Sequence, residues 1–141
     1  MAQNDFVWAS VPLPTDLPVR NYGTTDIPAF SVVKLDTGNL VSGTNESIGV
    51  AICGTADRPL GVTIDDLPST SATYSKQGRM RTVGWVPVSA DSAITAQTLC
   101  RAGFNGMVTS ELAGTSASIG QALQTAAAFG DVIMIQIQLS F

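Results

Sequence analysis

The feature that most constrains this 141-residue chain is a succession of short apolar runs separated by turn residues. Residues 32–35, 48–53 and 60–64 are such runs, and Ser, Thr, Gly and Asn fill the segments between them. Near the end, residues 132–139 alternate apolar and polar side chains, which is the period of a half-buried strand. Short strands with frequent turn signals predict a mainly β protein, a single-domain β-barrel or β-sandwich.

Two further segments refine this expectation. Residues 121–129 are rich in alanine but short and closed by a glycine, so we expect at most one short helix. Residues 80–88 are rich in β-forming side chains, and Pro87 within them is typical of an edge strand or a strand end. Trp85 stands in the middle of this run beside Val83 and is expected in the core.

The beginning of the chain differs from the remainder. Pro12, Pro14 and Pro18 follow one another at near-alternate spacing, which excludes a helix interior or a central strand. The same stretch holds the consecutive apolar side chains of Phe6, Val7 and Trp8. We therefore expect residues 1–22 to form an extended arm with apolar anchors and residues 23–141 to form a β-rich body. An edge strand lying on its own domain is the alternative.

A weak internal repeat runs through the body. Residues 27–41 resemble residues 94–108 in pattern, residues 59–64 resemble 118–123, and residues 78–86 resemble 130–138. The match is one of pattern and not of identity, so a chance likeness of β-hairpins is the alternative. If the repeat is real, it predicts two similar β units that close one barrel, with Gly61 and Gly120 in equivalent backbone positions.

Composition excludes several classes of function. Only 13% of the residues are charged and the formal net charge is −4, which argues against binding nucleic acid through its phosphates. The chain has no histidine, which excludes Ser-His-Asp and Cys-His catalysis and histidine-ligated zinc. No glycine-rich phosphate loop is present, so no cofactor is expected. A globular chain this poor in charge often buries part of its surface against partners.

The cysteines and the hydropathy pattern bear on where the protein is made. Cys53 and Cys100 stand apart without a CxxC motif, and we interpret them as buried free thiols in a reducing compartment, with a single disulfide as the alternative. The first residues lack the basic and apolar stretches of a signal peptide. No window approaches about 18 uninterrupted apolar residues, so no membrane span is expected. These features predict synthesis in a cytoplasm.

Asp36-Thr37-Gly38 is the one tripeptide with a catalytic appearance. Retroviral-type aspartic proteases carry Asp-Thr-Gly once per subunit and pair two carboxylates across a homodimer. Asn39 stands where that family has a small residue, and Lys34 stands where it has an apolar strand. We interpret the tripeptide as a hairpin turn and expect no enzymatic activity.

Two clusters of charged residues have ordinary and functional interpretations. Asp65 and Asp66, with Asp57 nearby, have oxygen ligands for a hard cation, but their spacing fits no calcium-binding loop, so no metal site is expected. Three of the seven basic residues form the one basic group, namely Lys76, Arg79 and Arg81. Alternate positions on a strand share one face, so this group is either a docking patch for an acidic partner or an ordinary solvated strand face.

Several phrases together resemble tailed-bacteriophage capsid decoration proteins, also called cement or head-stabilising proteins. They are Pro-Leu-Gly-Val at 59–62, Gly-Trp-Val-Pro-Val at 84–88, Ile-Thr-Ala at 94–96, and the stretch from Ile119 to Ile133, which contains Ile-Gly-Gln-Ala-Leu and Phe-Gly-Asp. The resemblance covers roughly residues 25–139 and rests on short motifs of Gly, Ala and Val. The arm lies outside it, and the loop at 67–78 is longer than in that family.

The resemblance implies a virion protein on the outer surface of an expanded phage capsid, made in the bacterial host cytoplasm. Such proteins sit as homotrimers and clamp neighbouring subunits of the major capsid protein, and their N-terminal arm reaches a capsid subunit or a sister copy. We therefore expect Phe6, Val7, Trp8, Pro12, Pro14 and the basic group to make capsid or subunit contacts. The alternatives are another virion component, such as a head-fibre base or a tail part, and the homodimeric protease.

Overall fold

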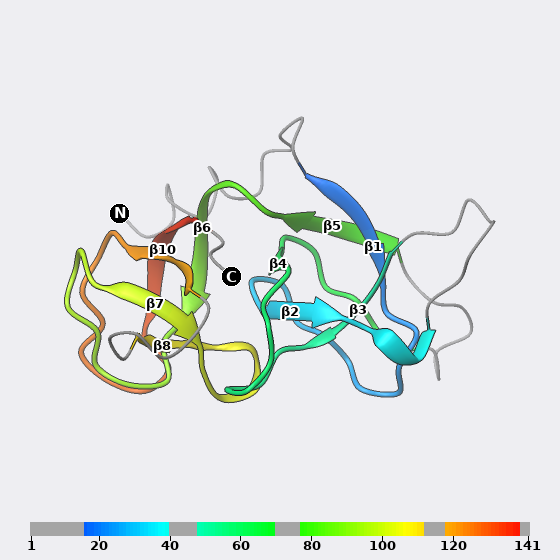
Figure 1. Ribbon diagram of the computed structural model, residues 1–141, viewed down its shortest axis with the longest axis horizontal. Coiled ribbons are helices and arrows are strands. Elements are labelled where there is room, and N and C mark those ends of the chain that lie inside the picture. The colour runs from blue at the N-terminus through cyan, green and yellow to red at the C-terminus, as the bar shows by residue number, and fades with distance from the viewer. Residues whose placement is uncertain (1–15, 40–47, 70–76, 112–117, 139–141) are drawn as a thin grey trace.

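The computed structural model describes residues 16–39, 48–69, 77–111 and 118–138 and shows two five-stranded β units side by side (Figure 1). We call residues 16–81 the N-terminal unit and residues 84–138 the C-terminal unit. The strands are β1 (Leu17–Arg20), β2 (Val32–Leu35), β3 (Ile48–Ile52), β4 (Gly61–Thr63), β5 (Gln77–Arg81), β6 (Gly84–Ser89), β7 (Leu99–Ala102), β8 (Val108–Ser110), β9 (Ser118–Ala122) and β10 (Val132–Ile137). The mainly β fold class is confirmed.

The N-terminal unit is a closed barrel in which the strands follow one another in the order β1, β3, β2, β4, β5. All neighbouring strands are antiparallel except β1 and β3, whose parallel pairing of Val19 with Ile48 closes the ring. Closure leaves this unit without a free strand edge. Short strands suffice because each strand finds partners on both sides.

The C-terminal unit repeats this order, since β6, β10, β9, β7 and β8 occupy the places of β1, β5, β4, β2 and β3. Its ring is less complete than that of the N-terminal unit. Among the described residues, β6 and β8 meet through one parallel bridge, Ala90 with Val108, at the place of the β1–β3 pairing. Pro87 therefore lies in a strand whose outer edge is largely free, as its sequence position predicts.

Matching hydrogen bonds confirm the internal repeat. The backbone N–H of Phe30 donates to Thr63 at 2.7 Å, and that of Gln97 donates to Ala122 at 2.7 Å. Both donors have a positive φ, 63° and 76° respectively. Two isolated bridges, Ile27 with Leu67 and Ile94 with Ala126, also correspond. The offset of 67 residues between the first parts of the repeat is the one that the sequence predicts.

Gly61 and Gly120 are equivalent, as predicted, because Gly61 pairs with Val33 and Gly120 pairs with Cys100 at the matching position. The expectation that the two units close one barrel is wrong. The N-terminal unit closes on itself with its own five strands, and the other five strands form a separate sheet.

The third part of the repeat also needs correction. Residues 78–86 span the end of β5 and the start of β6, and thus belong to both units. The strand pairing instead makes Gln136 the equivalent of Arg81. Gln136 pairs with Gln121, and Arg81 pairs with Val62.

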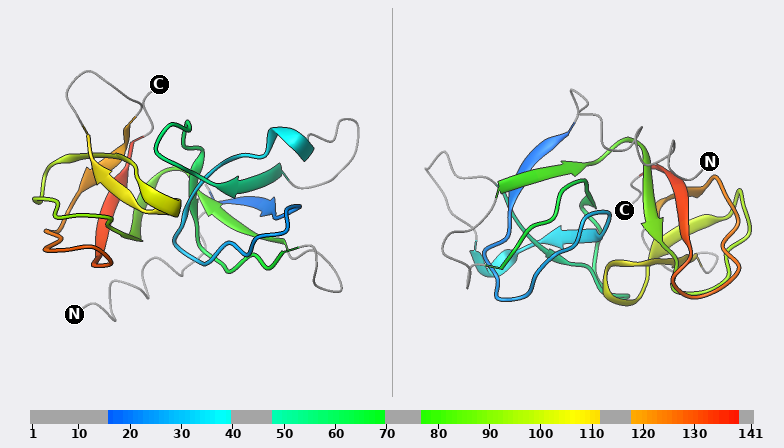
Figure 2. Two further views of the ribbon diagram at one scale, coloured as in Figure 1. Left: turned by 90° about the horizontal axis from the view of Figure 1, so that it is seen from below. Right: turned by 180° about the vertical axis from the view of Figure 1, so that it is seen from behind.

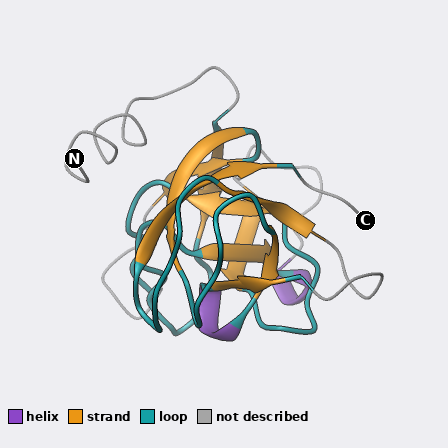
Figure 3. Cartoon of the chain, turned by 90° about the vertical axis from the view of Figure 1, so that its left-hand side faces the viewer, coloured by secondary structure: helices purple, strands orange, loops and turns teal. Residues whose placement is uncertain are grey.

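Helices are almost absent from the described residues. Two three-residue 3₁₀ turns are present, η1 (Thr37–Asn39) and η2 (Phe104–Gly106), and seen from one end of the molecule both lie on the same side (Figure 3). Residues 121–129, the segment with helical composition, continue β9 and then form bends and turns. Ala126 is held in a bridge to Ile94, which fixes this segment against the residues that precede β7 and not in a helix. The described part of the chain has no helix long and apolar enough to cross a membrane.

Two clusters of buried side chains form the core. The interior of the N-terminal barrel contains Val19, Ile27, Val33, Val50, Leu67 and Met80. The second cluster fills the C-terminal unit and also includes Val32, Cys53, Val62 and Ile64 of the N-terminal unit. Side chains alternate along a strand, so Val33 faces the barrel interior while Val32 faces out. The C-terminal unit thus covers this face of the N-terminal barrel, and the second cluster is shared by both units.

The described chain begins within the stretch expected to be an arm. Leu17–Arg20 is extended, but as strand β1 it pairs with β5 and β3 inside the barrel. Val19 is fully buried there. The alternative interpretation, a strand lying on its own domain, therefore applies to these four residues.

Candidate functional site

The basic group of the sequence does not form an exposed docking patch. Arg81 is 1% exposed, and its Nε lies 3.0 Å from Oδ1 of Asp16. Its Nη1 also donates to the carbonyl oxygen of Trp85 at 2.8 Å. The expectation of a surface contact through Arg81 is wrong, because its charge is neutralised by a buried carboxylate. The interaction instead ties the start of β1 to the junction between the two units.

Arg79 lies two residues away on the same strand but at the surface. Its guanidinium donates to both oxygens of the Asp65 carboxylate, at 3.0 and 2.9 Å. This hydrogen bond raises the pKa of Arg79, against a lowering by burial. Arg79 remains partly accessible, but its charge is already paired within the unit. Lys76, the third member of the group, lies outside the described residues.

The expected arm contacts also lie outside the described residues. They are Phe6, Val7, Trp8, Pro12 and Pro14. The described chain starts at Asp16, whose buried carboxylate marks where this segment joins the barrel. In Figure 1 the start of β1 lies near the end of β5, with which β1 pairs.

The strongest exposed apolar feature at the same junction is Trp85. The prediction that it lies in the core is wrong, since its side chain is 59% exposed and Val83 is also exposed. In β6 the residues that face the core are Val86 and Val88, so Trp85 falls on the outer face of the strand. Large exposed apolar side chains close together are typical of interaction surfaces. We call Val83 and Trp85 the junction surface.

A second exposed apolar feature is formed by two phenylalanines of the C-terminal unit. The rings of Phe104 and Phe129 have centroids 6.5 Å apart and are tilted by 43°. Both side chains are exposed. Carboxylates hold the two loops in place, because Asp91 accepts the backbone N–H of Phe104 and Asp131 accepts that of Ala127. The pair is thus presented on rigid backbone.

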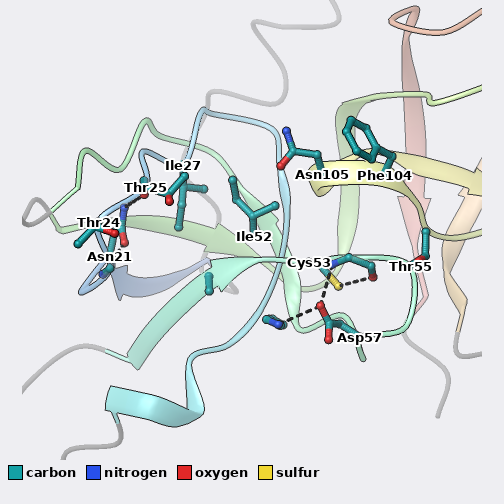
Figure 4. A pocket seen from close by; sticks show the side chains of 14 residues that line it. Asn21, Thr24, Thr25, Ile27, Ile52, Cys53, Thr55, Asp57, Phe104 and Asn105 are labelled. Carbon is teal, nitrogen blue, oxygen red and sulfur yellow. Dashed lines mark hydrogen bonds and ion pairs between the residues drawn. The ribbon is translucent and has the colours of Figure 1, made fainter.

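An open hollow of about 620 Å³ lies where η2 meets the N-terminal unit (Figure 4). Phe104 and Asn105 form its wall on one side, and Ile52, Cys53 and Asp57 form the other. The carboxylate of Asp57 is already hydrogen-bonded within the protein. It accepts a hydrogen bond from Nζ of Lys34 at 2.9 Å and one from the backbone N–H of Gly54 at 2.9 Å. The hollow therefore lacks a free charged group at this end and is mostly a seam between the units.

The remaining carboxylates of interest are structural. Asp36 accepts the backbone N–H of Gly38 at 3.1 Å, which is the turn that the sequence predicts for Asp36-Thr37-Gly38. Asp66 accepts the backbone N–H of Ala29 at 2.7 Å, and Asp65 is paired with Arg79. Within the described ranges, no group of three or more His, Cys, Asp or Glu side chains could hold a metal ion.

The two cysteines are buried free thiols, as expected. Burial raises the pKa of Cys53 from 9.0 to about 11, with the nearby Asp57 carboxylate acting in the same direction. Burial also raises the pKa of Cys100 to about 11, although a hydrogen bond from the backbone of Ala122 lowers it. Neither thiol is a nucleophile near neutral pH, because the thiolate is the reactive form.

Comparisons with known proteins extend the description of the fold. No family model and no curated protein matches the sequence. The chain is similar in fold to a phage head-fibre base. The crystal structure of the head fiber gp8.5 N base in bacteriophage phi29 matches with a TM-score of 0.65 at 15% identity. The match covers 87% of this chain and 94% of that one. The shared fold thus includes both units and not one barrel alone.

Sequence analysis missed the junction surface because it assigned Trp85 by its position in an apolar run. The alternation of side chains along the strand contains the correct signal. Trp85 falls on the opposite face of the strand from Val86 and Val88. It also missed the exposed pair of Phe104 and Phe129, which no short motif indicates. These two residues lie 25 positions apart and are brought together by the loops of the C-terminal unit.

Proposed function

We propose that this chain is a structural virion protein that binds the outer surface of an expanded phage capsid as a homotrimer. In this role it stabilises the capsid by clamping neighbouring subunits of the major capsid protein. The observation that carries the proposal is the fold, which is shared over nearly its whole length with a phage head-fibre base. The exposed apolar surfaces and the low content of charge support it, because both are typical of proteins that are buried in assemblies.

The proposed mechanism is thermodynamic linkage. A protein that binds the expanded lattice and not its unexpanded precursor stabilises the expanded state by mass action. Many symmetric copies then multiply a modest free energy for each site. The junction surface is the contact we assign to the capsid, because Trp85 is exposed where the N-terminal segment joins the barrel through Asp16. Phe6 and Trp8 of that segment extend the same contact.

Co-sedimentation with expanded, undecorated heads of the phage that encodes the chain tests this function. We expect saturable binding to expanded heads and none to unexpanded procapsids. Truncation of a central aromatic anchor typically costs about 2 kcal/mol or more, so Trp85→Ala is expected to weaken binding roughly thirty-fold. Trp8→Ala is expected to weaken it as well. Absence of pelleting at saturating protein would refute the proposal.

A matched control comes from the same pair of strands. Val132 is an exposed apolar residue opposite Ser89, whereas Trp85 lies opposite Gln136 toward the other end of the pairing. Val132→Ala therefore removes an exposed apolar side chain from the same sheet away from the junction surface. We expect it to bind heads like the wild type. Equal weakening by both substitutions would show that the junction surface is not the contact.

A head-fibre base is the second candidate, and the fold match favours it about equally. The two functions differ in where the protein lies on the particle. A clamp for capsid subunits occupies equivalent positions over the whole shell, whereas a fibre base occupies the attachment points of fibres. Electron cryo-microscopy of virions carrying a tagged copy of the chain separates them. Density restricted to fibre attachment points would favour the second function.

A further inference from the structure

The two units of one chain meet through a defined contact that the repeat should be able to form again. η2 of the C-terminal unit lies against the outer face of the N-terminal unit, where the backbone N–H of Gly106 donates to the carbonyl oxygen of Cys53 at 3.0 Å. A Cβ atom at Gly106 would lie 3.3 Å from Cβ of Ser31 and 3.4 Å from Cγ2 of Ile52. The approach of η2 is therefore close.

Beside this contact, the C-terminal unit covers an apolar face of the N-terminal unit. This face consists of Val32, Cys53, Val62 and Ile64, with Phe30 partly buried beside them. These side chains point out of the N-terminal barrel, and they belong to the buried cluster of the C-terminal unit. We call these five residues the covered face.

The C-terminal unit carries an equivalent face that is exposed or only partly buried. Hydrogen bonds fix the correspondence: Cys53 N–H donates to Val32 O at 3.0 Å, and Glu111 N–H donates to Leu99 O at 2.9 Å. The positions equivalent to the covered face are Gln97, Leu99, Glu111, Gln121 and Leu123. Val32 is completely buried, whereas Leu99 in the same place is 47% exposed. We call these five residues the open face.

The N-terminal unit has a matching free end. η1 follows β2 as η2 follows β7, and it lies at the end of the N-terminal unit that is far from the C-terminal unit (Figures 1 and 2). Leu35 and Ile48 beside it are 39% and 44% exposed. The residue equivalent to Leu35 is Ala102, which is buried in the shared core. We call η1, Leu35 and Ile48 the free end.

We propose that the open face is a docking site for the free end of a second copy of this chain. The occupant follows from continuity with the contact already present: the C-terminal unit lies on the covered face with η2 at the contact, and between copies the end of the N-terminal unit that carries η1 takes the corresponding place on the open face. The open face keeps Leu99 and Leu123 and has two glutamines and a glutamate around them. Such a mixed surface is typical of an interface that is exposed to water before association.

The contact joins two different surfaces, so it is heterologous. Repetition of a heterologous contact gives a ring if its rotation closes and a filament if it does not. A ring of three copies is the closed form that agrees with the proposed homotrimer. The inference deepens the self-association part of the proposed function by naming the surfaces used. It does not depend on binding to heads, which is measured separately.

Complementation between two variants of the full chain tests the proposal. Leu99→Arg disables the open face, and Leu35→Arg disables the free end. In sedimentation velocity experiments we expect the wild type to associate, and each variant alone to sediment as the 14.6 kDa monomer at concentrations where the wild type is assembled. An equimolar mixture of the variants retains one intact pair of surfaces. We expect it to form a heterodimer of twice that mass and nothing larger.

Three outcomes would overturn the proposal. A wild type that stays monomeric throughout would show that the open face is a terminal cap of the repeat. Assembly of either variant like the wild type would show that copies meet elsewhere. Two monomeric variants that fail to combine would point to a symmetric contact instead. Val83→Arg is the matched control, because it places the same charge at an exposed apolar position of the junction surface. It should assemble normally and lose binding to heads.

Discussion

The carboxylate of Asp16 and the guanidinium of Arg81 form an almost completely buried ion pair, with Oδ1 3.0 Å from Nε and Oδ2 3.2 Å from Nη2. Because Arg81 also donates to the carbonyl oxygen of Trp85, this one side chain connects three segments. They are the start of β1, the end of β5 and the start of β6. The pair therefore fixes the first strand of the N-terminal unit and the connection between the units at a single point.

Removal of Arg81 should destabilise the protein strongly. Arg81→Met removes the guanidinium that pairs with the buried Asp16 carboxylate, and breaking a buried ion pair from one side typically costs about 3–5 kcal/mol. We expect a decrease of this size in the free energy of unfolding, measured by urea denaturation. The double variant Asp16→Asn/Arg81→Met should recover part of the loss, because it also removes the buried charge of Asp16. Arg79→Met, two residues away in a half-exposed pair, should cost less than about 1 kcal/mol. Equal costs for Arg79 and Arg81 would contradict this account.

The equivalent glycines should be intolerant of a side chain for the same reason in both units. A Cβ at Gly120 would collide with the backbone carbonyl of Gln136, and one at Gly61 would lie 2.8 Å from the carbonyl oxygen of Arg81. Overpacking of this kind typically costs about 1–3 kcal/mol, so Gly61→Ala and Gly120→Ala should both lower the thermal unfolding temperature. Gly38→Ala is the control, since its nearest neighbour lies at 3.5 Å. A harmless substitution at Gly120 would contradict the close approach of β9 and β10.

The thiols should make stability fall at alkaline pH. The pKa values of Cys53 and Cys100 are raised from 9.0 to about 11 in the folded state, so the protonated thiol is favoured there. Their contribution to stability is complete below about pH 9 and is lost as the pH rises through 11. We expect the double variant Cys53→Ala/Cys100→Ala to show a flatter decline between pH 9 and 11 in denaturant unfolding.

The same burial predicts slow chemical modification. At pH 8 both native thiols should react with an aromatic disulfide reagent far more slowly than the thiols of the unfolded chain. Absorbance of the released thiolate measures this reaction directly. Rapid reaction of one equivalent in the folded protein would show that one cysteine is accessible.

The ion pair of Lys34 and Asp57 predicts that loss of Lys34 changes the pKa of Asp57. The hydrogen bond from Lys34, followed by that from the backbone of Gly54, holds the pKa of Asp57 below its ordinary value of 3.8. Lys34→Met should therefore raise the pKa of Asp57, observed by NMR titration of the carboxyl carbon. The stabilising effect of the pair is present above pH 3.8 and is lost as the pH falls through the lower pKa of the folded state. An unchanged titration of Asp57 would refute the assignment.

Much of the fold was predictable from local patterns. The apolar run at Val32–Leu35 is β2, and the alternating run near the end contains β10. The repeat predicted correctly that Gly61 and Gly120 are equivalent. At both positions a neighbouring strand comes too close for a side chain. Local spacing could not show whether the units would share one barrel. That depends on pairings such as Val19 with Ile48, which join residues far apart in the sequence.

The interaction surfaces were predicted less well. Arg81 and Arg79 share the same charge and neighbouring positions, yet one is buried against Asp16, 65 residues earlier, and the other lies at the surface. Trp85 lies in an apolar run, but on the face of the strand that points outward. Burial depends on what the rest of the chain places over a side chain, and short patterns do not contain that information.

The sequence by itself determined the mainly β class, the repeat, the turn at Asp36-Thr37-Gly38 and the buried state of the two cysteines. These follow from propensity, side-chain alternation and turn chemistry, which act over a few residues. Only the tertiary structure decided that the two units are a closed barrel and a separate sheet, that Asp16 neutralises Arg81, and that Val32 is covered while its equivalent Leu99 is exposed. The physical reason is that closure, charge pairing and burial arise from contacts between distant segments, and two nearly equivalent strands acquire different surroundings when the units pack.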